Sequence, residues 1–270
     1  MRLIPARDAS EIFARAIAQE APSTRVVLFS GGKDSSVTLD YMWRHHRSDI
    51  TGALHINTGI GLQSTHDFAR RFCAERGIPF FEITTTECYE SMIEEYGFPG
   101  SGAHFYTYVR LKERPLDAYV ASVKRKWKDR VALITGVRAE ESLRRMGNCV
   151  DINRNGAQVW VAPLIDWSTG DMQAYREKHS VEMSPASSTI HLSAECLCGA
   201  FGSPDELNLI EAFHPDPSVD RIRALERRLA ASGNPRCRWG VTVAGDPRTD
   251  GRAPGPMCVG CELRLPMEIT

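Results

Sequence analysis

The chain has 270 residues, of which 42% are hydrophobic and 25% are charged, a composition ordinary for a globular protein. This length accommodates one large α/β domain with an appendage and a substantial core. The 33 lysine and arginine residues are balanced by 34 aspartate and glutamate residues, so the net charge of −1 excludes an overall positive field that would recruit nucleic acid.

Targeting signals and cysteine content limit the cellular compartments that we expect for this protein. No apolar run reaches the roughly 18 residues of a membrane span, and no apolar core follows residues 1–8 as in a signal peptide. We therefore expect a cytoplasmic protein without membrane association, whose eight cysteines are reduced. Basic clusters at 124–130 and 221–228 are interpreted as solvated helix faces, with nucleic-acid binding as the alternative.

The first elements surround a glycine-rich turn. Residues 9–20 predict a helix, 25–29 a buried strand, and 36–44 a helix that follows Ser30-Gly31-Gly32-Lys33-Asp34-Ser35. Adjacent glycines permit positive φ and close backbone approach, and the first amides of the next helix have no partner within it. The helix dipole and Lys33 add positive charge, which predicts a polyphosphate site. The alternative is a plain turn capped by Asp34 or Ser35.

Strands and helices continue to alternate along the chain, which predicts a doubly wound parallel sheet with ligands at the carboxyl ends of its strands. Residues 96–110 are rich in glycine and aromatic residues and are interpreted as a mobile substrate loop, or alternatively as a surface excursion. The further strands are predicted at 52–57, 78–83, 131–134 and 159–164, and the further helices at 64–76, 115–127 and 168–179.

Arginines gather after the strand at 131–134. The run Thr135-Gly136-Val137-Arg138 is followed by Arg144 and Arg145, which have i,i+4 glutamate partners on a helix surface. Arg138 has no such partner, and a guanidinium suits phosphate and sulfate oxygens. Arg138 is therefore the first candidate for an oxyanion ligand, with Arg144 or Arg145 second.

Three motifs together resemble the phosphoadenosine phosphosulfate reductase family, within the N-type ATP pyrophosphatases of the adenine nucleotide alpha-hydrolase superfamily. They are the 30–35 loop, Thr-Gly-x-Arg-x-x-Glu-Ser-x-x-Arg at 135–145, and Pro-Leu-x-Asp-Trp before a helix at 163–179. The resemblance implies that the loop holds ATP phosphates, that Lys33, Asp34 and Arg138 act in catalysis, and that Asp34 helps to hold Mg²⁺. It further implies that adenine rests against the segment containing His55, Asn57, Thr58 and Gly59.

The last third of the chain is rich in cysteine. We expect a nucleotide-binding domain at 1–184 and a helical, cysteine-bearing appendage at 185–270, with helices at 204–213 and 218–231. Cys196 and Cys198 are separated by one residue, and Cys258 and Cys261 by two, so each pair is close enough to bind one metal. Thiolates at this spacing favour zinc or an iron–sulfur cluster. Some members of the resembled family carry a [4Fe–4S] cluster, which favours the cluster over zinc here. Four ligands are expected among Cys196, Cys198, Cys237, Cys258 and Cys261.

The resulting functional hypothesis is an ATP pyrophosphatase that activates an acceptor for sulfur incorporation, closest in type to the DNA phosphorothioation pyrophosphatases. Its expected partners are a nucleotide, sulfur-transfer or modification-system proteins, and DNA reached through a complex. A sulfonucleotide reductase is the first alternative, although the sequence has no cysteine after Cys261. The second alternative is a nucleotide-binding iron–sulfur switch or assembly subunit without turnover.

Overall fold

A computed structural model describes residues 8–100, 103–141, 150–241 and 243. Its centre is a six-stranded sheet in the order β3-β2-β1-β4-β6-β5. All neighbouring strands run parallel except β5 and β6. The strands are β1 (Thr24–Leu28), β2 (Gly52–Asn57), β3 (Phe80–Thr84), β4 (Val131–Ile134), β5 (Ile152–Asn155) and β6 (Gln158–Val161).

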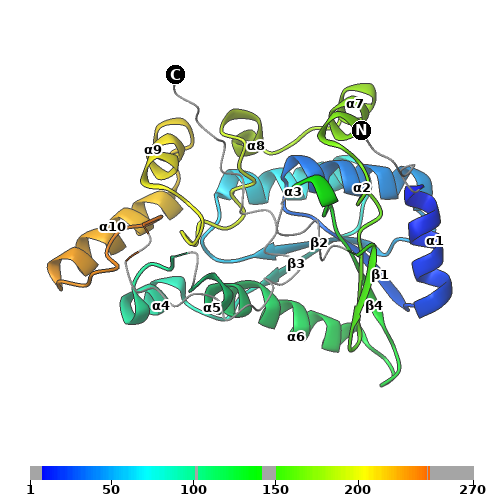
Figure 1. The fold of residues 1–270 in the computed structure, drawn as a ribbon, viewed down its shortest axis with the longest axis horizontal. Helices are drawn as coiled ribbons and strands as arrows, with labels where there is room; N and C mark the ends of the chain where they lie inside the picture. Colours follow the sequence, from blue (N-terminus) through cyan, green and yellow to red (C-terminus); the bar gives the residue numbers. More distant parts are fainter. Residues whose placement is uncertain (1–7, 101–102, 142–149, 242, 244–270) are drawn as a thin grey trace.

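Helices cover both faces of this sheet, as the sequence predicts (Figure 1). One core lies between the sheet and α1, α2, α3 and α7, and includes Phe13, Leu39 and Phe72. The opposite face packs Val26 and Leu133 against α6. The bounds are α1 (Ala9–Glu20), α2 (Lys33–His46), α3 (Gln63–Glu75), α6 (Arg114–Val123) and α7 (Thr169–His179).

A third apolar core joins the last third of the chain to earlier elements. Leu207 and Leu225 pack in one cluster with Ile60, Met92 and other residues that precede position 185. The predicted domain division after residue 184 remains a prediction. The helices involved are α4 (Tyr89–Tyr96), α8 (Pro185–Thr189), α9 (Pro204–Phe213) and α10 (Pro217–Ala231).

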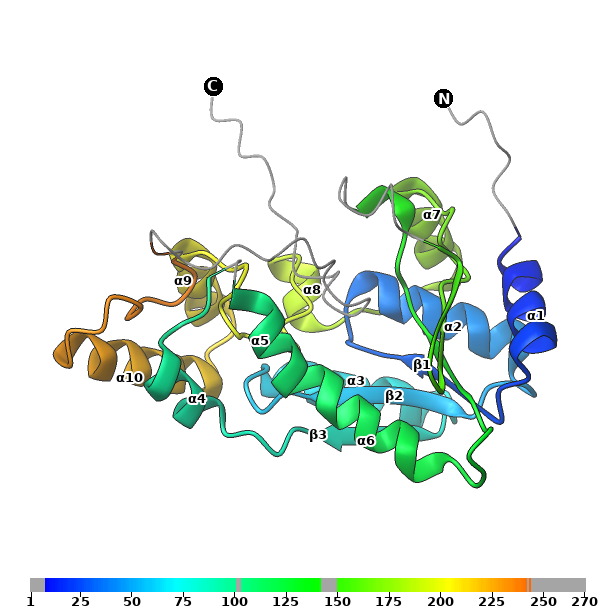
Figure 2. The same ribbon diagram turned by 60° about the horizontal axis from the view of Figure 1, so that its bottom comes forward.

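The predicted loop at 96–110 is wrong for its second half. Residues 104–113 form α5 (His104–Tyr108) and a π-helical turn, η2 (Val109–Glu113), which run directly into α6 (Figure 2). Four buried residues at helical spacing explain this: His104, Thr107, Tyr108 and Leu111. Tyr108 therefore belongs to a packed helix face, whereas Phe105 is 40% exposed. Within the described residues, no helix is long and apolar enough to cross a membrane.

Candidate active site

The site lies where the strand order reverses. From β1 the chain moves to β2 and β3 on one side, and later returns to place β4 on the other side of β1. Because β1 and β4 are parallel, the loops that follow them leave from the same edge of the sheet. In open α/β sheets this position forms the ligand-binding crevice. The 30–35 loop and residues 135–141 therefore meet there.

The 30–35 loop is held in shape by its two serine side chains. The Oγ atoms of Ser30 and Ser35 lie 3.0 Å apart, and the Ser35 hydroxyl donates to Gly32 O at 3.1 Å. Gly31 has φ of +76°, a conformation that other L-residues adopt only with strain. A Cβ on Gly32 would stand 3.0 Å from the Ser193 Cβ. Glycine is thus required by backbone conformation at one position and favoured by close packing at the next.

Lys33 occupies the first position of α2, at the positive end of the helix dipole. The N-cap is Gly32, which offers no side chain to satisfy the free amides. Lys33 is half-buried, and it forms no ion pair with a carboxylate among the residues that the structure describes. A cation at this end of a helix is unfavourable without a compensating anion. The arrangement fits an anion such as a phosphate group.

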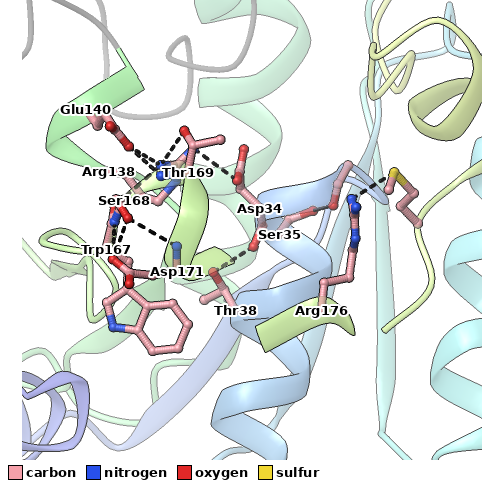
Figure 3. A network of polar contacts seen from close by, with 12 residues as sticks. Asp34, Ser35, Thr38, Arg138, Glu140, Trp167, Ser168, Thr169, Asp171 and Arg176 are labelled. Carbon is pink, nitrogen blue, oxygen red and sulfur yellow. Dashed lines mark hydrogen bonds and ion pairs between the residues drawn. The ribbon is translucent and has the colours of Figure 1, made fainter. Parts of the chain in front are cut away.

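Arg138 is buried at 2% exposure and lies beside the first turn of α2. Its guanidinium lies 3.3 Å from Asp34 Oδ1 and 3.4 Å from Glu140 Oε2, and it donates to Trp167 O and the Thr169 hydroxyl (Figure 3). The close approach of the segment after β4 to the first turn of α2 depends on Gly136, where a Cβ would meet Asp34 O at 3.0 Å. The structure therefore brings Gly136, Arg138 and Asp34 together.

The segment after β2 lies nearby but is more enclosed than expected. His55 is fully buried, with Nδ1 2.7 Å from Phe29 O and Nε2 2.7 Å from His66 Nδ1, so its side chain presents no surface to a ligand. Thr58 is also buried and donates to Glu195 O. Asn57 Oδ1 accepts from Gly59 N at 3.0 Å. Only Asn57 and Gly59 of this predicted set reach the surface.

A strap formed by residues 184–197 crosses the loops after β1 and β2, and sequence reasoning missed it. Ser184 N donates to Gly31 O at 2.9 Å. Further along, Leu197 N donates to Ile60 O at 2.8 Å. A Cβ on Gly61 would stand 2.3 Å from Glu195 O, so the two backbones are in direct contact. The strap and its partners are far apart in sequence, and no local pattern signals their pairing.

Cys196 and Cys198 lie at the end of the strap and line one small cavity together with His104, Tyr108 and Lys112. Lys112 forms an ion pair with Glu195 next to them. Cys237 is partly buried against the third apolar core, which was described above with Leu207 and Leu225. The described residues contain no group of three metal-ligating side chains. The predicted Cys258, Cys261, Arg144 and Arg145 lie outside the described residues.

Thiol ionisation differs between cysteines. A hydrogen bond from the Cys198 thiol lowers the pKa of Cys196 to about 7 against the opposing effect of burial, and the nearby Lys112 charge also lowers it. By contrast, burial raises the pKa of Cys73 to about 12. Cys196 therefore provides the thiolate form that metal ligation requires near neutral pH.

The family model for the phosphoadenosine phosphosulfate reductase domain matches residues 24–187, more than half of the chain. The chain belongs to this family. The match includes the 30–35 loop, Arg138 and the first residues of the strap. No curated protein matches the chain.

Solved structures similar to this family member include three proteins. Phosphoadenylyl-sulfate reductase from Candida auris, in a phosphate complex, is 16% identical, with a TM-score of 0.49 over 66% of this chain and 82% of that one. The U34-tRNA thiolase NcsA from Methanococcus maripaludis, with its [4Fe–4S] cluster, is 19% identical, with a TM-score of 0.44 over 82% and 78%. NH3-dependent NAD synthetase from Campylobacter jejuni subsp. jejuni is 16% identical, with a TM-score of 0.45 over 84% and 96%.

Proposed function

We propose that this phosphoadenosine phosphosulfate reductase family member is an ATP pyrophosphatase that cleaves ATP to AMP and pyrophosphate and so activates an acceptor for sulfur incorporation, with DNA phosphorothioation as the process. The observation that carries the proposal is Lys33. It is a half-buried cation at a helix N-terminus, beside a glycine turn and without a carboxylate partner in the described chain.

Binding follows from this arrangement. The β- and γ-phosphates of ATP occupy the turn, where the first amides of α2 and Lys33 face them. An acceptor oxygen attacks the α-phosphorus, the bond from that phosphorus to the bridging oxygen breaks, and pyrophosphate leaves. Lys33 and the amides stabilise the negative charge that builds up on the pyrophosphate as it leaves. Hydrosulfide then attacks the adenylated atom of the acceptor, a bond to sulfur forms as the bond to the AMP oxygen breaks, and AMP leaves with that oxygen.

Asp34 and Arg138 have complementary parts in this proposal. The Asp34 side chain is 19% exposed, so it can reach a Mg²⁺ ion bound to the phosphates while Arg138 holds it from behind. Mg²⁺ supplies charge neutralisation at the phosphate oxygens. Arg138 fixes the direction of the Asp34 carboxylate and, because its own side chain is only 2% exposed, acts on the phosphates through Asp34 as a positioning residue.

The cysteine group fits a soft metal centre. Cys196 and Cys198 share one cavity, and Cys196 has a pKa near neutrality. We infer that four of Cys196, Cys198, Cys237, Cys258 and Cys261 hold a [4Fe–4S] cluster, with zinc as the alternative metal. When bound, such a cluster would supply a site that can hold sulfur or transfer electrons.

The decisive experiment uses anaerobically purified protein with Mg²⁺ and ATP labelled at the α-phosphate, with and without DNA and a cysteine desulfurase. We expect AMP and pyrophosphate from the wild type, loss of both in Lys33→Ala, and retention in Lys178→Ala, a control that removes an exposed lysine of α7.

Two other outcomes would replace the proposal. Thioredoxin-dependent sulfite release from phosphoadenylyl sulfate would establish a reductase, a candidate that the lowered pKa of Cys196 favours. Tight ATP binding with no cleavage under any of these conditions would indicate a nucleotide-binding switch or assembly subunit.

A further inference from the structure

The turn between α6 and β4 carries an exposed tryptophan among cations. Trp127 is 82% exposed, whereas Trp160 and Trp239 are buried and Trp43 and Trp167 are packed against the core. Folding therefore gives no account of an indole at this position, because its apolar surface remains in water. A single exposed ring is ordinary on a protein surface, and it is the basic side chains around Trp127 that distinguish this position from the exposed Phe213.

The turn is ordered by hydrogen bonds of the Asp129 carboxylate and the backbone, which use none of the basic side chains of the turn. Asp129 Oδ2 accepts from the backbone amides of Arg125 and Lys126 at 2.8 and 2.9 Å, and Asp129 N donates to Lys126 O at 3.0 Å. The Lys128 Nζ lies 5.2 Å from the centre of the Trp127 ring. Trp127 thus projects from a closed turn, and little conformational entropy is lost when it binds.

Positive charge predominates around Trp127, where four basic side chains outnumber Asp129, the one carboxylate of the turn. Arg130 forms an ion pair with Glu20. None of Lys124, Arg125, Lys126 and Lys128 pairs with a carboxylate in the part of the chain that the structure describes. The carboxylate of Asp129 is committed to the turn itself. Four cations around an exposed indole complement a phosphate backbone that carries unpaired bases.

A groove adjoins the turn and extends this surface. Its volume is about 440 Å³, and Arg125, Tyr119 and Phe81 line it together with the hydroxyl-bearing Ser23, Thr24 and Thr51. The rings of Phe81 and Tyr119 lie 6.4 Å apart. Aromatic rings beside hydroxyls and a guanidinium suit a flipped base with its phosphate, and the volume falls within the range of small-ligand pockets.

The surface is separate from the ATP site. Residues 124–130 precede β4, whereas the 30–35 loop follows the parallel β1, so the two lie at opposite edges of the sheet (Figure 2). The five residues of β1 span roughly 17 Å at about 3.3 Å per residue.

We propose that the 124–130 turn and its groove form a docking surface for single-stranded nucleic acid, in which Trp127 stacks on a base and Lys124, Arg125, Lys126 and Lys128 contact phosphates. Binding at this surface requires no ATP turnover. A test of this binding is therefore independent of the proposed pyrophosphatase activity. In an enzyme that modifies nucleic acid, this surface would hold the strand while a nearby phosphate reaches the ATP site.

The test measures fluorescence anisotropy of labelled single-stranded DNA and RNA of one sequence, and of the matching duplex, with full-length protein at several salt concentrations. We expect single strands to bind more tightly than the duplex. Trp127→Ala should weaken binding at least about fivefold, and Trp127→Phe should weaken it less. The triple variant Lys124→Ala, Lys126→Ala, Lys128→Ala should lower the slope of log K against log salt by about 2, at ~0.7 per lost contact.

The matched control is Phe213→Ala, which removes an aromatic ring that is 59% exposed on α9. It should bind as the wild type does, and thermal unfolding should show all variants folded. Equal affinity of Trp127→Ala and wild type, or no binding of the oligonucleotides at low salt, would overturn the proposal. Binding of polyglutamate to wild type but not to the triple variant, without oligonucleotide binding, would assign the surface to an acidic protein instead.

Discussion

Lys33 tests the phosphate site at the scale of one residue. Because its charge lies at the positive end of α2 without a carboxylate partner in the described chain, Lys33→Ala should leave the free energy of unfolding unchanged or raise it by up to about 1 kcal/mol. The same change should weaken ATP binding at least tenfold. Calorimetric titration and urea unfolding measure the two effects, with Lys178→Ala as control. Unchanged ATP affinity would remove Lys33 from the site.

Arg138, unlike Lys33, should stabilise the folded state. Its removal leaves the Asp34 carboxylate, which is 19% exposed, without its ion-pair partner. Arg138→Ala should therefore lower the free energy of unfolding by about 3 kcal/mol, in addition to weakening turnover. Arg154→Ala, which removes a half-exposed arginine from a longer ion pair, should cost less than about 1 kcal/mol. Equal losses in urea unfolding for both variants would contradict this assignment.

Cys196 should show a pH dependence that Cys73 lacks. With metal removed, alkylation of Cys196 by iodoacetamide should reach half its maximal rate at about pH 7, because the Cys198 hydrogen bond lowers its pKa from the ordinary 9.0. Since folding lowers this pKa, the thiolate stabilises the folded state fully above pH 9.0, and this stabilisation is lost as the pH falls through about 7. Site-resolved mass spectrometry measures the rates. A midpoint above pH 8.5 would contradict the lowered pKa.

At the scale of elements, much of the architecture follows from local patterns. The helix at 9–20 and the strands at 52–57 and 131–134 coincide with α1, β2 and β4, because the helix has apolar residues at helical spacing and the strands are short, mainly apolar runs. β5 was missed because its residues face water and give no alternation, although Asn155-Gly156 is a hairpin signal. The glycine turn at 30–35 was predicted from its residues, whereas the ion pair between Asp34 and Arg138 was not.

The strap was not predictable, since its contacts join residues more than a hundred positions apart. Gly61→Ala tests it, because the new Cβ would stand 2.3 Å from Glu195 O, a backbone atom that cannot rotate away. We expect a loss of about 1–3 kcal/mol in urea unfolding. Gly170→Ala is the control, because its Cβ would meet only the Ser168 Oγ at 3.6 Å and alanine favours the helix. Equal stability of both variants would contradict the packing.

At the scale of the whole molecule, the proposed cluster would join cysteines that are spread over residues 196–261. Anaerobically purified protein should be brown and contain about four iron atoms per chain, as four-cysteine ligation of one cluster requires. Paired replacement of Cys258 and Cys261 by serine should abolish the colour and lower the melting temperature, because metal binding is coupled to folding. Iron and zinc analysis with thermal unfolding measures both. A colourless protein with one zinc ion per chain would show that the cysteines hold zinc and not a cluster.

The hydrogen bonds of the strap also set an order of events during synthesis. Thr58 donates to Glu195 O, and Thr65 donates to Ser193 O, across 137 and 128 positions of sequence. Most of the chain must therefore leave the ribosome before the strap can pack against the turn at 30–35. Contacts of such long range form slowly and leave early segments exposed meanwhile. A nascent chain arrested before residue 184 should not retain ATP, and the ability to do so should appear only after the strap has emerged.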